Sequence, residues 1–270
     1  MALTFLHPEP GARIKVIGAG LPRTGTTSFC AALSVLLKAP AYHAGVQYGA
    51  GSPSETHILT MMEAARGFPY SDPEHKRHVY RKLENILDGY AATADSPLIQ
   101  LVPELMEIYP DAKVICTVRD RHTWAKSVLL MAQASQPRLA KFIFFWIPSL
   151  RYLPEFAEAL THIWSIRYGQ GITSEEGALK IWGRHLEYLE DVVPKEKLFY
   201  YTVKDGWGPL CEILELPIPD EPFPRLNDAK DFQVMFQKLA LQGLLRWVMV
   251  FSGIIVAIVF AYWISSGGQR

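Results

Sequence analysis

A short apolar stretch that ends in glycines and leads into a helical segment constrains this chain most. Residues 14–17 (Ile-Lys-Val-Ile) predict a buried strand, which Gly18 and Gly20 close. After a Pro-Arg-Thr-Gly turn, a helical pattern runs over residues 26–37. A strand, a glycine loop and a helix in this order place the unpaired amides of the helix amino terminus at the loop. Such a loop is suited to bind an anion.

The order of strand and helix recurs around residue 118. Lys113–Val118 (KVICTV) is rich in β-branched residues and follows a Tyr-Pro-Asp turn. A helix is expected from about His122 to Met131. The sequence therefore predicts an α/β domain with a mainly parallel sheet flanked by helices. Its ligand is expected beyond the carboxyl ends of the strands.

A third unit follows in the second half of the chain. Leu198–Val203 (LFYYTV) reads as a strand, and Asp205–Trp207 opens another short helix. The long helix before this strand has an apolar stripe, and Thr173 with Glu176 has the spacing of a capping box at its start. These elements extend the predicted α/β domain towards residue 215.

The loop has the two-glycine spacing of a P-loop, but it lacks the feature that marks a nucleoside triphosphatase. Such a P-loop carries Lys directly before its Ser or Thr, and Thr26 stands at that place. The cation of the loop, Arg23, comes earlier. A dinucleotide-binding interpretation of Gly18 and Gly20 is weak too, because Arg23 occupies the third glycine position. ATP or GTP hydrolysis is thereby disfavoured, and the fold class is a P-loop-type sheet.

Residues 22–27 (Pro-Arg-Thr-Gly-Thr-Thr) resemble the 5′-phosphosulfate loop of sulfotransferases that use 3′-phosphoadenosine 5′-phosphosulfate (PAPS). A second motif of that family, an Arg at a strand end with a Ser eight residues later, matches Arg119 and Ser127. The resemblance covers most of the chain before the apolar end and is greatest to the divergent fungal sulfotransferase-like proteins. It implies a site in which Arg119 and Ser127 hold the 3′-phosphate. The loop residues that would hold the 5′-phosphosulfate are Arg23, Thr24, Gly25, Thr26 and Thr27.

The resemblance also implies catalytic roles. Arg23 would stabilise the bridging oxygen as the sulfuryl group leaves. Where the family has a His before a small residue and Pro, this chain has Asp95, Ser96 and Pro97, so Asp95 is the candidate base. A helix amino-terminal cap at Asp95 is an equal alternative. His43 is the second candidate base, against which stands the structural role that a lone His usually has.

Two function hypotheses remain open. The first is sulfuryl transfer from PAPS to a hydroxyl of a lipophilic small molecule. The second is a PAPS-independent biosynthetic step on the same fold, such as cyclisation or lactonisation of a polyketide or related secondary metabolite. Departures from the family motivate it: Ser28 and Phe29 stand where a Trp is common, and Arg121 replaces a Pro. A non-catalytic membrane-tethered binding protein is a weaker third alternative.

The end of the chain is a candidate transmembrane segment. Trp247–Ile264 is almost wholly apolar, so we expect a helix over residues 244–266 that follows a domain of residues 1–240. Lys230, Lys238 and Arg246 precede the segment, and this bias favours a single-pass C-terminal anchor with the catalytic domain in the cytosol. The alternative is a buried helix or one that forms a homodimer.

Composition excludes several partners. The chain has 27 basic and 27 acidic residues without a basic run, so nucleic acid is not an expected partner. The histidines show no convincing metal spacing, and no metal is predicted. Cys30, Cys116 and Cys211 are expected to be small buried residues of a protein in a reducing compartment. The aromatic segment 141–156 is either packed in the core or an apolar lid over a substrate.

Overall fold

The computed structural model describes residues 7–49, 54–134, 140–226 and 228–267. Its centre is a parallel sheet of five strands in the order β2-β3-β1-β4-β5. The strands are β1 (Val16–Gly18), β2 (Ala41–His43), β3 (Ala92–Ala94), β4 (Lys113–Thr117) and β5 (Leu198–Tyr201). The predicted α/β class with a mainly parallel sheet is confirmed.

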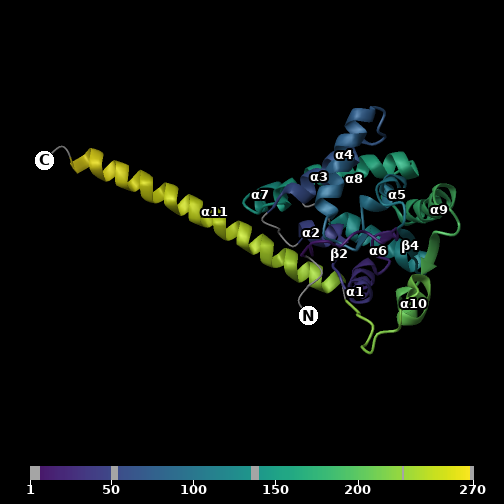
Figure 1. Cartoon of the computed structure of the whole chain (residues 1–270). Coiled ribbons are helices and arrows are strands. Elements are labelled where there is room, and N and C mark those ends of the chain that lie inside the picture. The colour runs from purple at the N-terminus through teal and green to yellow at the C-terminus, as the bar shows by residue number, and fades with distance from the viewer. Residues whose placement is uncertain (1–6, 50–53, 135–139, 227, 268–270) are drawn as a thin grey trace.

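Helices cover the sheet and connect its strands (Figure 1). Those of the α/β domain are α1 (Thr26–Leu37), α2 (Ala44–Gly49), α3 (Thr56–Gly67), α4 (Pro73–Leu87), α5 (Val102–Ile108), α6 (Arg121–Ala134), α7 (Ala140–Ile143), α8 (Leu153–Tyr168), α9 (Glu175–Val192) and α10 (Trp207–Leu214). Short 3₁₀ turns are η2 (Leu98–Gln100), η3 (Leu150–Tyr152) and η4 (Val203–Asp205). The last helix, α11 (Asp228–Gly267), runs away from the domain in Figure 1.

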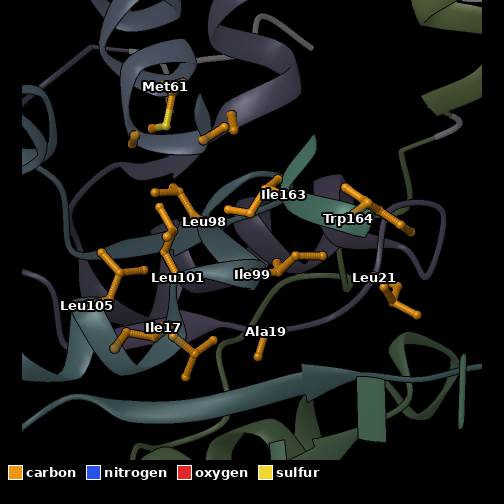
Figure 2. Close-up of a cluster of buried hydrophobic side chains, with 14 of the residues drawn as sticks. Ile17, Ala19, Leu21, Met61, Leu98, Ile99, Leu101, Leu105, Ile163 and Trp164 are labelled. Carbon is orange, nitrogen blue, oxygen red and sulfur yellow. The ribbon is translucent and has the colours of Figure 1, made fainter. Parts of the chain in front are cut away.

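Apart from the edge strand β5, which is partly exposed, the sheet is buried on both faces, as is typical of a parallel sheet. Val16 of β1 joins one hydrophobic cluster with Phe29 of α1 and Leu210 of α10. Ile17, the next residue, points to the other face and joins a larger cluster. Figure 2 shows part of that cluster, in which Ile17 lies with Leu101 and Leu105 and with side chains from α3 and α8.

The strands that carry runs of apolar residues were predicted, and β2 and β3 were not. Both have three residues, and alanine supplies much of their sequence (Ala-Tyr-His and Ala-Thr-Ala). Such segments have little intrinsic strand preference. The two segments pair with each other, with His43 opposite Ala94, and β3 also pairs with β1 in the buried centre of the sheet. Their strand conformation therefore depends on these neighbours.

The capping prediction for α9 is wrong by one residue. Ser174, rather than Thr173, is the cap, and its hydroxyl accepts a hydrogen bond from the Gly177 amide at 3.0 Å. The helix therefore begins at Glu175, and Glu175 and Glu176 lie in its first turn, where acidic side chains are favoured. All three cysteines are buried, as expected.

The aromatic segment 141–156 is split between burial and exposure. Phe144, Ile147 and Leu150 are buried in a small cluster with Leu239 and Ala240 of α11. Phe142 and Phe145 are exposed. Part of the segment therefore packs against α11 near Leu239 and Ala240.

The C-terminal helix begins earlier than the predicted 244–266. Because α11 starts at Asp228, it runs without a break through residues 240–244, where a boundary was expected. Its segment Gln237–Ser266 is long and apolar enough to cross a membrane, and the most apolar 18-residue stretch within it has a mean hydropathy of 2.4.

Candidate functional site

The glycine loop lies at the carboxyl end of β1 and leads directly into α1. Gly25 is the residue before the first turn of α1 and has no side chain to cap its amides, and that turn contains no acidic residue. Gly25 has a φ of 96°, a left-handed conformation that favours glycine. A Cβ there would also lie 3.0 Å from Val203 Cγ2. The loop therefore presents the positive end of the α1 dipole, as an anion site requires.

Arg23 connects the two predicted phosphate motifs. Its Nε donates a hydrogen bond to Ser127 Oγ of α6 at 3.3 Å. Its carbonyl oxygen accepts one from Arg119 Nη1 at 3.0 Å. Arg23 also has a φ of 71°, an uncommon conformation for a side chain of this size. The structure thus brings Arg23, Arg119 and Ser127 together, from segments about a hundred residues apart in the chain.

Buried hydrogen bonds hold the loop against β4 and α6. The Thr24 hydroxyl donates to the Leu21 carbonyl at 2.7 Å and lies 2.6 Å from Thr117 Oγ1 at the end of β4. The Trp124 indole donates to the Pro22 carbonyl at 2.8 Å. Because these groups are buried, they stabilise one loop conformation and keep its backbone in place for a ligand.

Thr26 and Thr27 contact His43, one of the two candidate bases. His43 Nε2 lies 2.9 Å from Thr26 Oγ1 and 3.1 Å from Thr27 Oγ1. The ring is buried at the end of β2, and the Val46 amide lies 3.3 Å from its Nδ1. The imidazole is thereby held between the loop and the start of α2.

Asp95, the other candidate base, lies beside His43. Its Oδ2 is 3.5 Å from His43 Nδ1, because Asp95 directly follows β3 and His43 is the last residue of the neighbouring strand β2. Its Oδ1 accepts a hydrogen bond from the Ser96 amide at 2.8 Å. The Asp95 side chain is 16% exposed against 6% for that of His43, so it is the more accessible of the two. The structure brings together two residues that the sequence offered as alternatives.

The local backbone at Asp95 is constrained on several sides. Its φ is 78°, in the left-handed region. A Cβ at Gly45 would lie 2.6 Å from Asp95 Oδ2, so glycine allows the carboxylate to approach α2. The cap position of the following turn η2 is Pro97, and no side chain caps it. The alternative of a helix cap at Asp95 is therefore wrong.

His185 supports the loop from behind, a role that the sequence analysis missed. It is fully buried on α9, and burial lowers its pKa to about 4. The neutral ring donates from Nε2 to the Ala19 carbonyl at 2.7 Å and accepts at Nδ1 from the Tyr168 hydroxyl at 2.9 Å. Its place close to the apolar stripe of α9, beside Leu186 and Leu189, was the signal that could have indicated a buried structural His.

A second contact unforeseen from sequence lies at the start of α1. Ser28 Oγ accepts a hydrogen bond from the Leu226 amide at 2.9 Å, although the two residues are far apart in the chain. Phe223 in the same segment packs on Trp207 with ring centroids 4.9 Å apart. Because Leu226 bonds to Ser28 at the start of α1, the preceding residue Arg225 also lies near the glycine loop. Arg225 belongs to the last segment of the chain before α11. The run Pro-Phe-Pro-Arg of residues 222–225 is its signal in the sequence.

Metal ligands do not gather in the described parts of the chain. Among residues 7–49, 54–134, 140–226 and 228–267, the structure has no group of three or more His, Cys, Asp or Glu side chains placed to hold a metal ion.

Comparison with known proteins finds a curated fungal relative and similar solved structures. The chain is 26% identical over 216 residues to "Ava biosynthesis cluster protein M" of Aspergillus versicolor, and the match covers 79% of this chain and 80% of the relative. A solved sulfotransferase from Alicyclobacillus acidocaldarius is 15% identical, with a TM-score of 0.39 over 88% of this chain and 96% of that one. Sulfotransferase STF9 from Mycobacterium avium is 15% identical, with a TM-score of 0.34 over 86% and 69%.

The family match extends over the α/β domain. The sequence model of a family described as a sulfotransferase domain matches residues 15–232, which include every site residue discussed above. The chain belongs to the sulfotransferase domain family.

Proposed function

We propose that this protein transfers a sulfuryl group from PAPS to a hydroxyl of a lipophilic small molecule. The observation that carries the proposal is the junction of two phosphate motifs at one edge of the sheet, where Arg23 contacts Ser127 and Arg119 contacts the Arg23 carbonyl. PAPS has phosphate at both its 3′ and 5′ positions, so a site for it needs two anion-binding elements in contact. Membership of the sulfotransferase domain family supports the same substrate.

The loop residues fit the 5′-phosphosulfate end. Gly25 leaves the first-turn amides of α1 without a side-chain cap, and Arg23 adds a cation at the same place. PAPS supplies an activated sulfuryl group whose leaving group is a phosphate. We assign to Arg23 and the α1 amides the stabilisation of charge on that phosphate, because preorganised donors act most strongly where charge develops. Arg119 and Ser127 would bind the 3′-phosphate.

We assign the proton transfer to Asp95. Its carboxylate is more accessible than the His43 ring, whose Nε2 is next to the hydroxyls of Thr26 and Thr27. The acceptor oxygen forms its bond to sulfur, the bond between sulfur and the phosphate oxygen breaks, and Asp95 accepts the hydroxyl proton. His43 would act as a positioning residue that links the Asp95 carboxylate to the loop.

A PAPS-independent reaction is the second candidate. It is favoured by the relative from Aspergillus versicolor, which is named for a biosynthesis cluster. In this alternative the loop and Arg23 would polarise an enolate or carboxylate during cyclisation or lactonisation of a polyketide or a related metabolite. Ser28 and Phe29, which stand where a Trp is common in the family, are engaged with Leu226 and with the hydrophobic cluster under α1.

We also propose that α11 anchors the protein in a membrane, with the α/β domain on the cytosolic side. The support is the helix segment Gln237–Ser266, none of whose most apolar stretch is buried in the protein. A catalytic domain held at a membrane is suited to an acceptor that partitions into lipid.

Product analysis tests the proposed reaction. The full chain in detergent is incubated with PAPS and a set of apolar phenols and alcohols, and release of 3′-phosphoadenosine 5′-phosphate is followed by mass spectrometry. The proposal predicts release that depends on both the acceptor and the enzyme. No release with any acceptor, together with conversion of polyketide substrates in the absence of PAPS, would favour the second candidate.

A further inference from the structure

A group of aromatic side chains lies where α7 and the residues after it pack against α11, and the proposed reaction does not use them. Phe142, Phe145 and Trp146 come from α7 and the residues after it, and Trp247 comes from α11. We call these four residues the aromatic collar. Phe142 stacks on Trp247 with ring centroids 4.4 Å apart and planes at 10°. Phe145 and Trp146 lie at 5.7 and 5.3 Å from the same ring.

Hydrogen bonds and a close backbone approach fix the collar to the helix. The Trp247 indole donates to the Phe142 carbonyl at 2.7 Å, and Arg246 donates to the Trp146 carbonyl. At Gly243 the helix approaches so closely that a Cβ would overlap the Ile143 carbonyl oxygen. This packing therefore fixes the position of residues 142–146 along the axis of α11, beside residues 243–247.

Helix length determines where this level lies relative to a bilayer. The apolar segment of α11 has 30 residues, which at about 1.5 Å per residue exceeds a hydrocarbon core of about 30 Å by roughly ten residues. Leu239, Ala240 and Gly243 pack against the domain, so the excess lies at this end. The part left for the hydrocarbon core then begins close to Trp247.

The exposed parts of the collar have the chemistry of a membrane interface. Phe142 is 45% and Phe145 49% exposed, although both are large apolar side chains. On α11, Leu244, Leu245 and Val248 are exposed at the same level. Trp favours the headgroup region, Phe is common among the apolar side chains that enter the interface, and an apolar patch of this kind marks a contact surface.

We infer that the aromatic collar is a second membrane contact, which inserts Phe142 and Phe145 at headgroup depth and holds the domain against the bilayer. This inference rests on the proposed anchoring by α11. The collar would hold the α/β domain, and with it the candidate site, close to the lipid from which a lipophilic acceptor is drawn. The occupant of this surface is the bilayer, and a second copy of the chain is the competing outcome.

Depth-dependent quenching tests the inference on the full chain in phosphatidylcholine vesicles. Single cysteines replace Phe145, Ile255 and Ile218, which are all exposed, and each carries an environment-sensitive fluorophore. The native cysteines are buried and react poorly with the label. Ile255 reports insertion of α11, Phe145 reports the collar, and Ile218 is the matched exposed position outside both. Thermal unfolding of each labelled variant checks that it is folded.

The inference predicts that lipids with a quencher in the upper acyl chain reduce the Phe145→Cys signal at least twofold more than the Ile218→Cys signal. Deeply placed quenchers should act on Ile255→Cys, and iodide in the buffer should act mainly on Ile218→Cys. If Ile255→Cys is quenched by lipid while Phe145→Cys is quenched by iodide, the anchor stands and the collar contact is wrong. If lipid reaches neither probe, both proposals fail. If Phe145→Cys is shielded from lipid and iodide alike until unlabelled chain is diluted away, the collar binds a second copy, and the inference is overturned.

Discussion

The glycine-loop site and the aromatic collar are built in opposite ways. At the site, groups from β1, β4, α6 and α9 converge through hydrogen bonds among buried or half-buried polar atoms, as at Thr24 with Thr117 and at Ala19 with His185. At the collar, large rings contact one another while much of their surface stays exposed. The first arrangement would fix the geometry of the proposed anion site. The second leaves apolar surface that needs a partner.

The comparison implies that the two regions can be disrupted separately. Changes at the site should alter nucleotide binding or turnover and leave membrane association intact. Changes at the collar should do the reverse.

Asp95→Asn should lower turnover at least about 100-fold, because the amide cannot accept the hydroxyl proton. Affinity for 3′-phosphoadenosine 5′-phosphate should stay within about twofold, since the amide oxygen can still accept from the Ser96 amide. Initial rates and calorimetry measure the two effects, with Asp220→Asn on the exposed surface as the control. If His43→Gln abolishes turnover while Asp95→Asn keeps most of it, the base is His43.

Mild acid should destabilise the support behind the loop through His185. The pKa of His185 in the folded protein is about 4, below the usual value of about 6.5. The stability that the neutral ring contributes is therefore complete above about pH 6.5 and is lost as the pH falls towards 4. A single group of this kind is worth about 2 kcal/mol between pH 6.5 and pH 5. Urea unfolding followed by Trp fluorescence at several pH values measures the slope.

His185→Gln should remove that part of the pH dependence, and His122→Gln, at an exposed position of α6, should keep it. Equal slopes in the wild type and in His185→Gln would contradict the assignment of a neutral His185.

Gly25→Ala should weaken binding of 3′-phosphoadenosine 5′-phosphate at least about tenfold. The φ of 96° is unfavourable for Ala by about 1–2 kcal/mol, and the new Cβ would press on Val203. Gly206→Ala is the matched control, because Gly206 also has a positive φ but nothing lies within 4 Å of its Cβ position. An equal loss of affinity in both variants would mean that strain, rather than the loop, controls binding.

Gly243→Val should have the smallest effect on the site and a clear one on the collar. Its side chain would collide with the Ile143 carbonyl and move α11 off α7, which changes the Trp247 environment and its fluorescence. Nucleotide affinity should remain within about twofold. Gly253→Val, on the same helix with open space around it, should change neither measurement. Loss of nucleotide binding in Gly243→Val alone would show that the two regions are coupled.

Local patterns predicted much of the framework. Helix α1 has the bounds expected from the glycine loop and the apolar residues that follow it, and β4 differs from its expected range by one residue. The alanine-rich β2 and β3 escaped prediction, because their strand conformation depends on neighbours in the sheet.

The site was predictable in its parts and not in its assembly. Motifs placed Arg23, Arg119 and Ser127 as candidates, yet the bond from Arg23 to Ser127 depends on how β1 and α6 pack. Asp95 and His43 were alternatives in the sequence, because no spacing rule relates the ends of two strands that are separated by the helices α2, α3 and α4. His185 bonds to Ala19, which is 166 residues away in the chain, and no sequence motif indicated this contact.

If the two motifs form one site for a nucleotide with 3′ and 5′ phosphates, the protein should bind 3′-phosphoadenosine 5′-phosphate. Calorimetric titration of this nucleotide into the full chain in detergent measures that binding. Arg119→Ala removes a site cation, and Arg81→Ala on α4 removes a surface cation as the control. The account predicts micromolar binding that Arg119→Ala weakens at least about tenfold, about 1.4 kcal/mol, and that Arg81→Ala leaves unchanged. Absence of binding to the folded wild-type chain, or equal binding in Arg119→Ala, would contradict it.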